Sequence, residues 1–266
     1  MPKARWEDAL GISRGTLSFT GKQAGKDKAV AVAIEQWHDQ DDTMGHRKLA
    51  VLLKMGKNRV KRVMKKYGIA ARRKKKRYIY PGKTNSVVPN RLRDEQTPAE
   101  AEVVFSDIFE VQSADRTKVR GCFALRKRTR HILALAFDYQ MRTDLVVSTI
   151  EMIAFAVPGM IWQSDQGSQY GVEQTGDALL RKGFERSMSR AGTPTDNGYA
   201  ERFVGQFKLS VAERRAYRTL GEFLQAAETW INFYNHLRPH EGLEQQSPDS
   251  YACEQGLPAA PYLALF

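Results

Sequence analysis

The sequence has few of the residues on which several classes of site and compartment depend. Its two cysteines, Cys122 and Cys253, exclude a disulfide framework and a cysteine-rich zinc site. None of its five histidines has a partner at the ligand spacing of a His/Cys zinc site. No run approaches the roughly 18 consecutive apolar residues of a membrane-spanning helix, and the N-terminus has no apolar signal-peptide core. We therefore expect a reduced, cytoplasmic protein without a membrane partner.

Positive charge is abundant and unevenly placed. The chain has 42 Lys and Arg against 30 Asp and Glu, which gives a net charge of +12. Residues 1–93 hold 24 basic and 7 acidic side chains, or +17, whereas the remainder holds 18 and 23, or −5. The first third is therefore predicted to bind a polyanion, and the rest to have a different role.

Apolar residues recur at helical spacing in residues 29–37, 47–53 and 57–69. A short helix, a turn at Gly56 and a second helix are typical of a helix-turn-helix. The alternative is a pair of surface helices with solvated lysines, which the basic run at 71–78 disfavours. The predicted DNA contacts are Arg59, Lys61, Arg62, Lys65, Arg72 and Arg73.

The texture of the chain changes near residue 99. Three strands are predicted before a helical pattern, followed by strand and helix in alternation, which indicates an α/β sheet with helices on its faces. The expected strands cover residues 100–111, 121–125, 131–137, 159–163 and 184–188, and the expected helices cover 143–156, 173–183 and 195–216. We divide the chain into a helix-turn-helix region at 1–71, a basic linker at 72–98, an α/β domain at 99–250 and a tail at 251–266.

Asp107 is an acid on an apolar strand face. Alternate residues from Val103 to Val111 read Val, Phe, Asp, Phe, Val, so the carboxylate points with the apolar set. An unpaired carboxylate there costs several kcal/mol. An arginine partner, a backbone hydrogen bond or a metal ion could compensate it.

Two further acids occur where ligands are often found. Asp165 ends the fourth strand just before Gly167, at the carboxyl end of the sheet, although an N-cap or an Asx-turn is the commoner role of such an aspartate when it is taken alone. Glu201 lies at the edge of the apolar stripe of the last helix, where a first-turn acid also suits the helix dipole. Together the three acids could bind hard divalent cations such as Mg²⁺.

Three segments resemble a known family. Residues 164–170, 187–208 and 234–251 are similar to the integrase-like transposases of bacterial insertion sequences, the "insertion sequence three" family, within the wider group of DDE recombinases. Thirty-five residues separate Asp165 from Glu201, Lys208 follows seven residues later, and Asp107 has the usual interval before Asp165. The resemblance covers about residues 9–251.

This resemblance implies a ribonuclease-H-like mixed sheet with flanking helices, preceded by a small all-α helix-turn-helix domain. It implies that Asp107, Asp165 and Glu201 bind two Mg²⁺ or Mn²⁺ ions and catalyse strand cleavage at element ends and strand transfer of the 3′-hydroxyl. Lys208 would contact terminal DNA, Asn197 would support the turn into the Glu201 helix, and the loop around Gly167 would leave room for DNA.

The resemblance also implies partners. These are double-stranded DNA, both terminal inverted repeats and target, a second copy of the chain on DNA, and a helix-turn-helix product of an upstream frame. The setting would be bacterial and nucleoid-associated. A catalytically inactive DNA-binding regulator or inhibitor stays open, as does a ribonuclease of similar fold. The chain departs from the usual family residues at Val104, Phe109, Glu110, Arg126 and Gln163.

Overall fold

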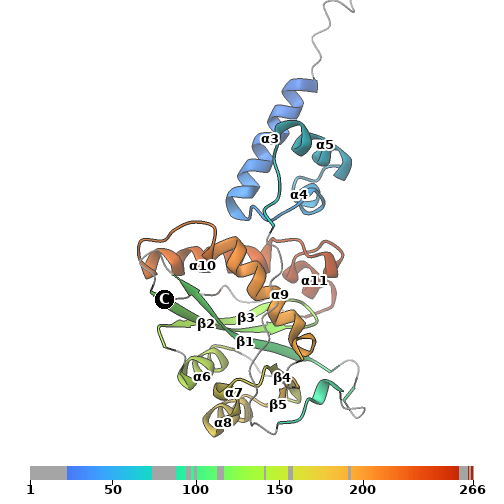
Figure 1. The fold of residues 1–266 in the computed structure, drawn as a ribbon. Helices are drawn as coiled ribbons and strands as arrows, with labels where there is room; N and C mark the ends of the chain where they lie inside the picture. Colours follow the sequence, from blue (N-terminus) through green and yellow to red (C-terminus); the bar gives the residue numbers. More distant parts are fainter. Residues whose placement is uncertain are drawn as a thin grey trace, which may run out of the picture.

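A helical unit and an α/β unit follow one another along the chain, and the helical unit lies against the helical layer that covers one face of the sheet (Figure 1). The expectations for residues 1–22 and for most of the basic linker lie outside the described residues. The computed structural model describes residues 23–73, 88–93, 97–98, 101–112, 117–140, 142–154, 158–190, 193–257, 263 and 265.

The helical unit consists of α3 (Gln23–Gln40), α4 (His46–Leu52) and α5 (Lys57–Tyr67). All three predicted helices are therefore confirmed, and α3 is longer than its apolar pattern suggested. The stripe on α5 is buried at Val60, Val63 and Met64, while Tyr67 stays exposed. No helix in the described ranges is long and apolar enough to span a bilayer.

Five strands form one mixed sheet in the order β3-β2-β1-β4-β5. Neighbouring strands pair antiparallel from β1 to β3, whereas β4 pairs parallel with β1 and with β5. This arrangement confirms the predicted α/β class and places each predicted strand within a few residues of its expected position. The strands are β1 (Val103–Gln112), β2 (Lys118–Arg126), β3 (Ile132–Asp138), β4 (Met160–Ser164) and β5 (Phe184–Met188).

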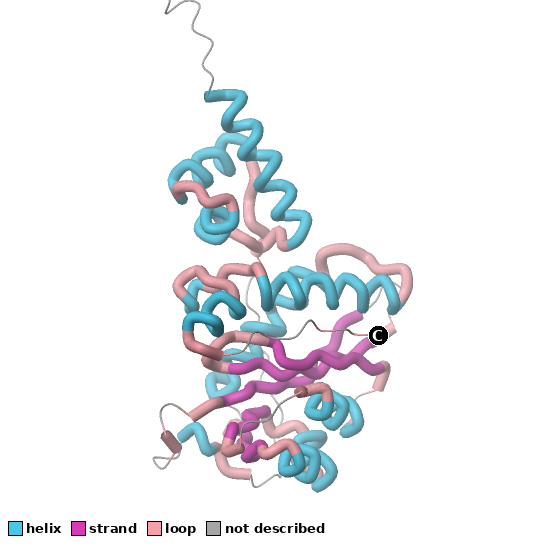
Figure 2. The backbone as a smooth tube through the Cα atoms, turned by 180° about the vertical axis from the view of Figure 1, so that it is seen from behind, coloured by secondary structure: helices cyan, strands magenta, loops and turns pink. Residues whose placement is uncertain are grey.

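Helices cover both faces of the sheet (Figure 2). One layer contains α9 (Gly198–Phe207) and α10 (Leu220–His236), and the other contains α6 (Thr143–Glu151), α7 (Ser168–Gly171) and α8 (Glu173–Arg181). Two apolar clusters result, one on each face, and the cluster under α9 continues into the core of α3–α5. The helical unit is therefore packed on the α/β unit through apolar side chains.

The helix expected at 195–216 is wrong at both ends. A 3₁₀ turn at Pro194–Asn197 precedes α9, and a π-helical turn at Lys208–Ala212 follows it. In the π turn the backbone N–H of Glu213 donates to the carbonyl of Lys208 at 2.7 Å, five residues back. Apolar periodicity does not record this change, and the residues that bond to the turn, Arg72 and Asp41, lie far away in the sequence.

Other boundaries also moved. The helix expected at 143–156 ends at Glu151. The sequence interpretation did not include α10, whose N-cap Thr219 accepts a hydrogen bond from the N–H of Glu222 at 3.1 Å. It also did not include α11 (Pro248–Glu254), which runs across the boundary expected at residue 250.

Replacing Phe203 by Ala should test the packing of α9. The ring is only 2% exposed and contacts Phe123 at a centroid distance of 4.4 Å, as well as α10. We expect a loss of about 3–5 kcal/mol in the free energy of unfolding, measured by urea denaturation. Leu180→Ala on α8, 75% exposed, is the control and should change the unfolding free energy by less than about 0.5 kcal/mol. Equal losses would contradict this account of the core.

Candidate active site

Asp107 and Asp165 come from neighbouring parallel strands at the same level. The register pairs Val103 with Ile161 and Phe105 with Gln163, so the next residues on this side are Asp107 and Asp165. Phe105 and Ile161 both belong to the apolar cluster under α9. Because side chains alternate along a strand, this register directs both carboxylates to the face that α9 covers.

The Asp107 carboxyl group lies in an unfavourable environment for a charge. Burial raises its pKa to about 7, and the negative charges of Asp165 and Glu201 act in the same direction. A hydrogen bond from the N–H of Ile108, 2.8 Å long, and the positive charge of Lys208 oppose this rise. Asp165, Glu201 and Lys208 are thus close enough to affect the ionisation of Asp107.

Asp165 is accessible to solvent directly after β4. Neighbouring protein atoms nevertheless desolvate its carboxyl group and raise its pKa, while a 3.0 Å hydrogen bond from the N–H of Gly167 lowers it. The Asx-turn alternative is therefore present in the geometry, and it orients the carboxylate toward the loop rather than excluding it as a ligand.

Gly167 has a specific role in this loop. A Cβ atom at this position would lie 3.0 Å from Oδ1 of Asp165 and 3.4 Å from the side chain of Gln169. Any larger residue would therefore press on the carboxylate that the Gly167 N–H orients.

Ser106, beside Asp107, is bonded to both neighbouring loops. The Nδ2 of Asn197 donates to the carbonyl of Ser106 at 3.2 Å, which joins the turn before α9 to β1. The hydroxyl of Tyr170 lies 2.8 Å from that of Ser106, which joins the loop after Asp165 to the same strand. The sequence interpretation named Asn197 but missed Tyr170, whose place at the end of the 164–170 segment was the available signal.

Glu201 and Lys208 lie near opposite ends of α9. Glu201 is exposed in the first helical turn, and Lys208 is half-buried as the first residue of the π turn. The stacking of Tyr199 on Phe105, with centroids 5.0 Å apart, and the contact of Phe207 with Phe109 at 5.2 Å fix the helix over β1. Asp107 lies between these two aromatic contacts along the strand.

An ion-pair cluster holds the turn before α9. Asp196 accepts hydrogen bonds from Arg190 at 3.0 Å and from Arg93 at 3.0 Å, and Asn90 donates to it at 2.8 Å. Burial acts to raise the pKa of Asp196, but the bonds from Arg190 and Arg93 outweigh it and keep the pKa below its ordinary value. The sequence interpretation missed Asp196, although an aspartate beside Asn197 and Gly198 is a turn signal.

The acids have the donor chemistry of a hard divalent cation but do not form a closed ligand set. Among the residues that the structure describes, no three His, Cys, Asp or Glu side chains are placed to hold a metal ion. The raised pKa of Asp107 reports uncompensated negative charge, which a dication would relieve. Oδ1 of Asn197 is also buried and has no hydrogen-bond partner in the described part, so an acceptor stays available near β1.

The basic candidates on the helical unit separate into two groups. The first group is exposed on α5 or directly after it and consists of Arg59, Lys61, Lys65 and Arg73. Arg62 is also exposed, but it donates twice to the fully buried carboxylate of Asp27, with both bonds 2.7 Å long. These bonds, with one from Lys66, hold the pKa of Asp27 well below its usual range. Arg72 likewise has protein partners, Asp42 among them at 3.0 Å.

Two protein-family models match the α/β unit. A family model described as "Integrase core domain" matches residues 98–194, and a second with the same description matches residues 182–248. Together they span the strands and helices that carry the three acids. The predicted resemblance to integrase-like proteins is therefore confirmed for the part of the chain that holds the site.

Relatives of similar length come from bacterial insertion sequences. The 31.7 kDa protein of insertion element IS407 from Burkholderia multivorans is 22% identical over 251 residues, covering 92% of this chain and 88% of the relative. InsK of element IS150 from Escherichia coli K12 is 25% identical over 263 residues, covering 91% and 88%. The transposase of IS904 from Lactococcus lactis is 36% identical over 95 residues, covering 35% and 38%.

A solved structure has the same fold. A chain of the simian T-cell lymphotropic virus intasome, solved in complex with PP2A regulatory subunit B56 gamma, superimposes with a TM-score of 0.50 at 14% identity. The match covers 83% of this chain and 78% of that chain. With the strand order described above, it confirms the ribonuclease-H-like fold class.

The Asp107 carboxyl group should make stability depend on pH in the absence of metal. Its pKa of about 7 exceeds the ordinary 3.8, so the folded protein binds this proton more tightly than the unfolded chain. The resulting stabilisation is complete below about pH 4 and is lost as the pH rises through 7. We therefore expect Asp107→Asn to gain about 2–3 kcal/mol over wild type between pH 5 and pH 8, in urea denaturation with EDTA.

Asp177→Asn is the matched control, because Asp177 is exposed on α8 in the opposite layer. Its difference from wild type should stay constant between the two pH values. A constant difference for Asp107→Asn as well would show that Asp107 is not desolvated.

Proposed function

We propose that this chain, a member of the insertion-sequence transposases with a DDE integrase-like catalytic domain, cleaves DNA strands at the ends of an element and transfers the 3′-hydroxyl to target DNA. As a polynucleotidyl transferase it acts on phosphodiesters. The observation that carries the proposal is the placement of Asp107 on the face of β1 that α9 covers, where the charges of Asp165 and Glu201 reach it. A purely structural sheet has no need for this arrangement.

The three carboxylates would hold one or two Mg²⁺ or Mn²⁺ ions. When bound, such ions supply Lewis-acid polarisation of a phosphodiester and activation of water or a 3′-hydroxyl. The chain's own contribution is position, because phosphoryl transfer needs an in-line nucleophile and neutralised charge more than covalent chemistry. Ser106, bonded to Asn197 and Tyr170, keeps the three acid-bearing segments aligned.

Lys208 would contact the DNA phosphate beside the carboxylates. Its charge acts on Asp107 across the face that α9 covers. A lysine ammonium is a compact cation that can approach a phosphate from many directions. This placement supports the role in binding terminal DNA that the family resemblance implies.

The helical unit would bind duplex DNA through α5 and its surroundings. Arg59, Lys61 and Lys65 are exposed on this helix. A nearby concave surface of about 570 Å³ has Arg47, Lys54 and Lys57 in its lining, together with Gln245 of the α/β unit. DNA in this position would touch both units, and oligomers of the chain, with or without an upstream-frame product, would bring two element ends together.

Glu201→Gln should separate catalysis from binding. The substitution keeps size and removes a charge, so we expect strand nicking and joining to fall at least about a hundredfold while DNA affinity is retained. The measurement uses a labelled duplex copied from inverted repeats that flank the gene, with Mg²⁺ and then Mn²⁺. Glu173→Gln, also in the first turn of a helix and exposed, is the control and should keep full activity.

The same assay decides between the two candidate functions. Wild-type protein that binds the repeat duplex without nicking or joining it would favour the inactive regulator. Full activity in Glu201→Gln would show that the carboxylates are not the catalytic group.

Replacing Arg59, Lys61 and Lys65 by Ala, singly and together, should weaken DNA binding. Each lost phosphate contact should reduce the slope of log affinity against log salt by about 0.9. Fluorescence anisotropy over a salt series measures both quantities. Arg181→Ala on α8 is the control, because Arg181 pairs with Glu151 on the far layer. An unchanged slope in the triple variant would exclude α5 as the DNA-binding surface.

A further inference from the structure

The two ends of the α4–α5 helix pair are joined to each other beside α9. Asp42 precedes α4, and Arg72 follows α5. The Arg72 guanidinium donates to both carboxylate oxygens of Asp42, at 3.0 and 3.1 Å, and the Arg72 backbone N–H donates to the Asp42 carbonyl at 2.9 Å. A bidentate pair of this kind is directional as well as strong. The helix pair is therefore a loop closed at its base.

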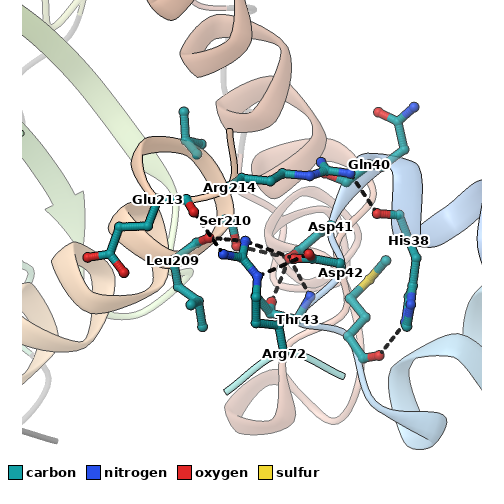
Figure 3. Close-up of polar contacts among 12 residues, drawn as sticks. His38, Gln40, Asp41, Asp42, Thr43, Arg72, Leu209, Ser210, Glu213 and Arg214 are labelled. Carbon is teal, nitrogen blue, oxygen red and sulfur yellow. Dashed lines mark hydrogen bonds and ion pairs between the residues drawn. The ribbon is translucent and has the colours of Figure 1, made fainter. Parts of the chain in front are cut away.

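The same guanidinium holds the end of the π turn (Figure 3). It donates to the carbonyl of Glu213 at 3.1 Å and to the carbonyl of Leu209. In a regular α-helix the Leu209 carbonyl would accept from the N–H of Glu213, which here donates to Lys208. The next N–H, of Arg214, donates to Val211 at 3.2 Å. Arg72 thus donates to the Leu209 carbonyl in place of the N–H of Glu213, which in the π turn donates to Lys208.

A second set of contacts fixes the same turn from the other side. The fully buried carboxylate of Asp41 accepts from the hydroxyl of Ser210 at 2.9 Å and from Nε of Arg238 at 2.7 Å. Burial acts to raise the pKa of Asp41, but the charge and hydrogen bond of Arg238 outweigh it and keep the pKa below its ordinary value. Arg214 donates back to the carbonyl of His38 at 2.8 Å. The turn and the segment before α4 therefore form one polar junction.

This junction lies next to Lys208, whose ammonium group is the positive charge beside the carboxylates. Lys208 begins the π turn, and the two residues after it are held from outside, the Leu209 carbonyl by Arg72 and the Ser210 hydroxyl by Asp41. If the turn reverted to a regular helix, the residues after Lys208 would rotate relative to α9, and the Lys208 carbonyl would lose its bond from the N–H of Glu213. A misplacement of about 1 Å can cost on the order of a hundredfold in rate.

We propose that Arg72 is a positioning residue for strand transfer. Its bidentate ion pair with Asp42 holds the π turn in place, and the π turn in turn holds Lys208 beside the carboxylates. The Arg72–Asp42 ion pair thereby links the DNA-binding helix pair to the catalytic site. This inference rests on the proposed function. It also gives Arg72 a different role from the DNA contact expected from the sequence, since its Nε, Nη1 and Nη2 atoms all donate within the protein.

The test compares two adjacent arginines. Arg72→Ala should lower kcat for strand joining on the repeat duplex by about tenfold to a hundredfold, with KM and DNA affinity unchanged. Arg73→Ala removes the same charge from an exposed neighbour and should instead raise KM and weaken affinity. If both variants change KM alone, Arg72 is a DNA contact and the inference is wrong.

A double-mutant cycle with Lys208→Ala identifies the route of the effect. If Arg72 acts through Lys208, then Arg72→Ala causes no further loss of kcat once Lys208 is replaced by Ala. Losses that multiply in the double variant would overturn the inference.

Asp42→Asn provides a second entry to the cycle should Arg72→Ala not fold, as judged by far-UV circular dichroism. This substitution keeps the size of the side chain and weakens the ion pair with Arg72. A loss of kcat that disappears in the Lys208→Ala background supports the inference, and a wild-type kcat contradicts it. Wild-type protein without any joining activity would instead contradict the proposed function, so the two failures are distinguishable.

Discussion

A carboxylate on an apolar sheet face is the constraint around which the α/β unit is arranged. Asp107 lies between Phe105 and Phe109, whose rings pack against α9. Burial and two neighbouring acids make its ionised form unfavourable, whereas a backbone N–H and the charge of Lys208 favour it. The apolar contacts of α9 with the sheet and α10 therefore hold together a group of charges that repel one another. Proteins accept such local conflict at sites where it serves function.

Ser106 shows how the segments that carry the mutually repelling acids are held in position. Its carbonyl is bound by Asn197 from the turn before α9, and its hydroxyl contacts Tyr170 from the loop after Asp165. One strand position thus joins the three segments that carry the acids. The hydroxyl pair is buried beside the sulfur of Cys122, which lies 3.6 Å from each hydroxyl, so these groups make their hydrogen bonds within the protein and in fixed directions. The acids are positioned by neighbours that are not themselves acidic.

Net charge overstates the basic surface that DNA can reach. Arg62 neutralises the buried Asp27, Arg238 neutralises the buried Asp41, and Arg72 is used at the junction between the units. The guanidinium group suits these positions because its planar fork can bind a carboxylate and carbonyls together. All the basic side chains on α5 are exposed, but two of them, Arg62 and Lys66, are paired with Asp27. This division explains how a strongly basic region can also pack tightly on an acidic partner unit.

Spacing and periodicity along the sequence are enough to predict the fold class and the candidate ligands. Alternation in β1 placed Asp107 on the covered face, strand order and turn signals indicated the α/β class, and the intervals among Asp107, Asp165 and Glu201 marked the candidate ligands. These features are local, or they are distances along the chain, so a sequence records them directly. Tertiary structure alone decided which arginines face solvent, where α9 changes to a π turn, and that Tyr170 meets Ser106. Each of these depends on partners far away in sequence, such as Arg72 and Leu209, whose contact arises only once the helical unit packs on the sheet layer.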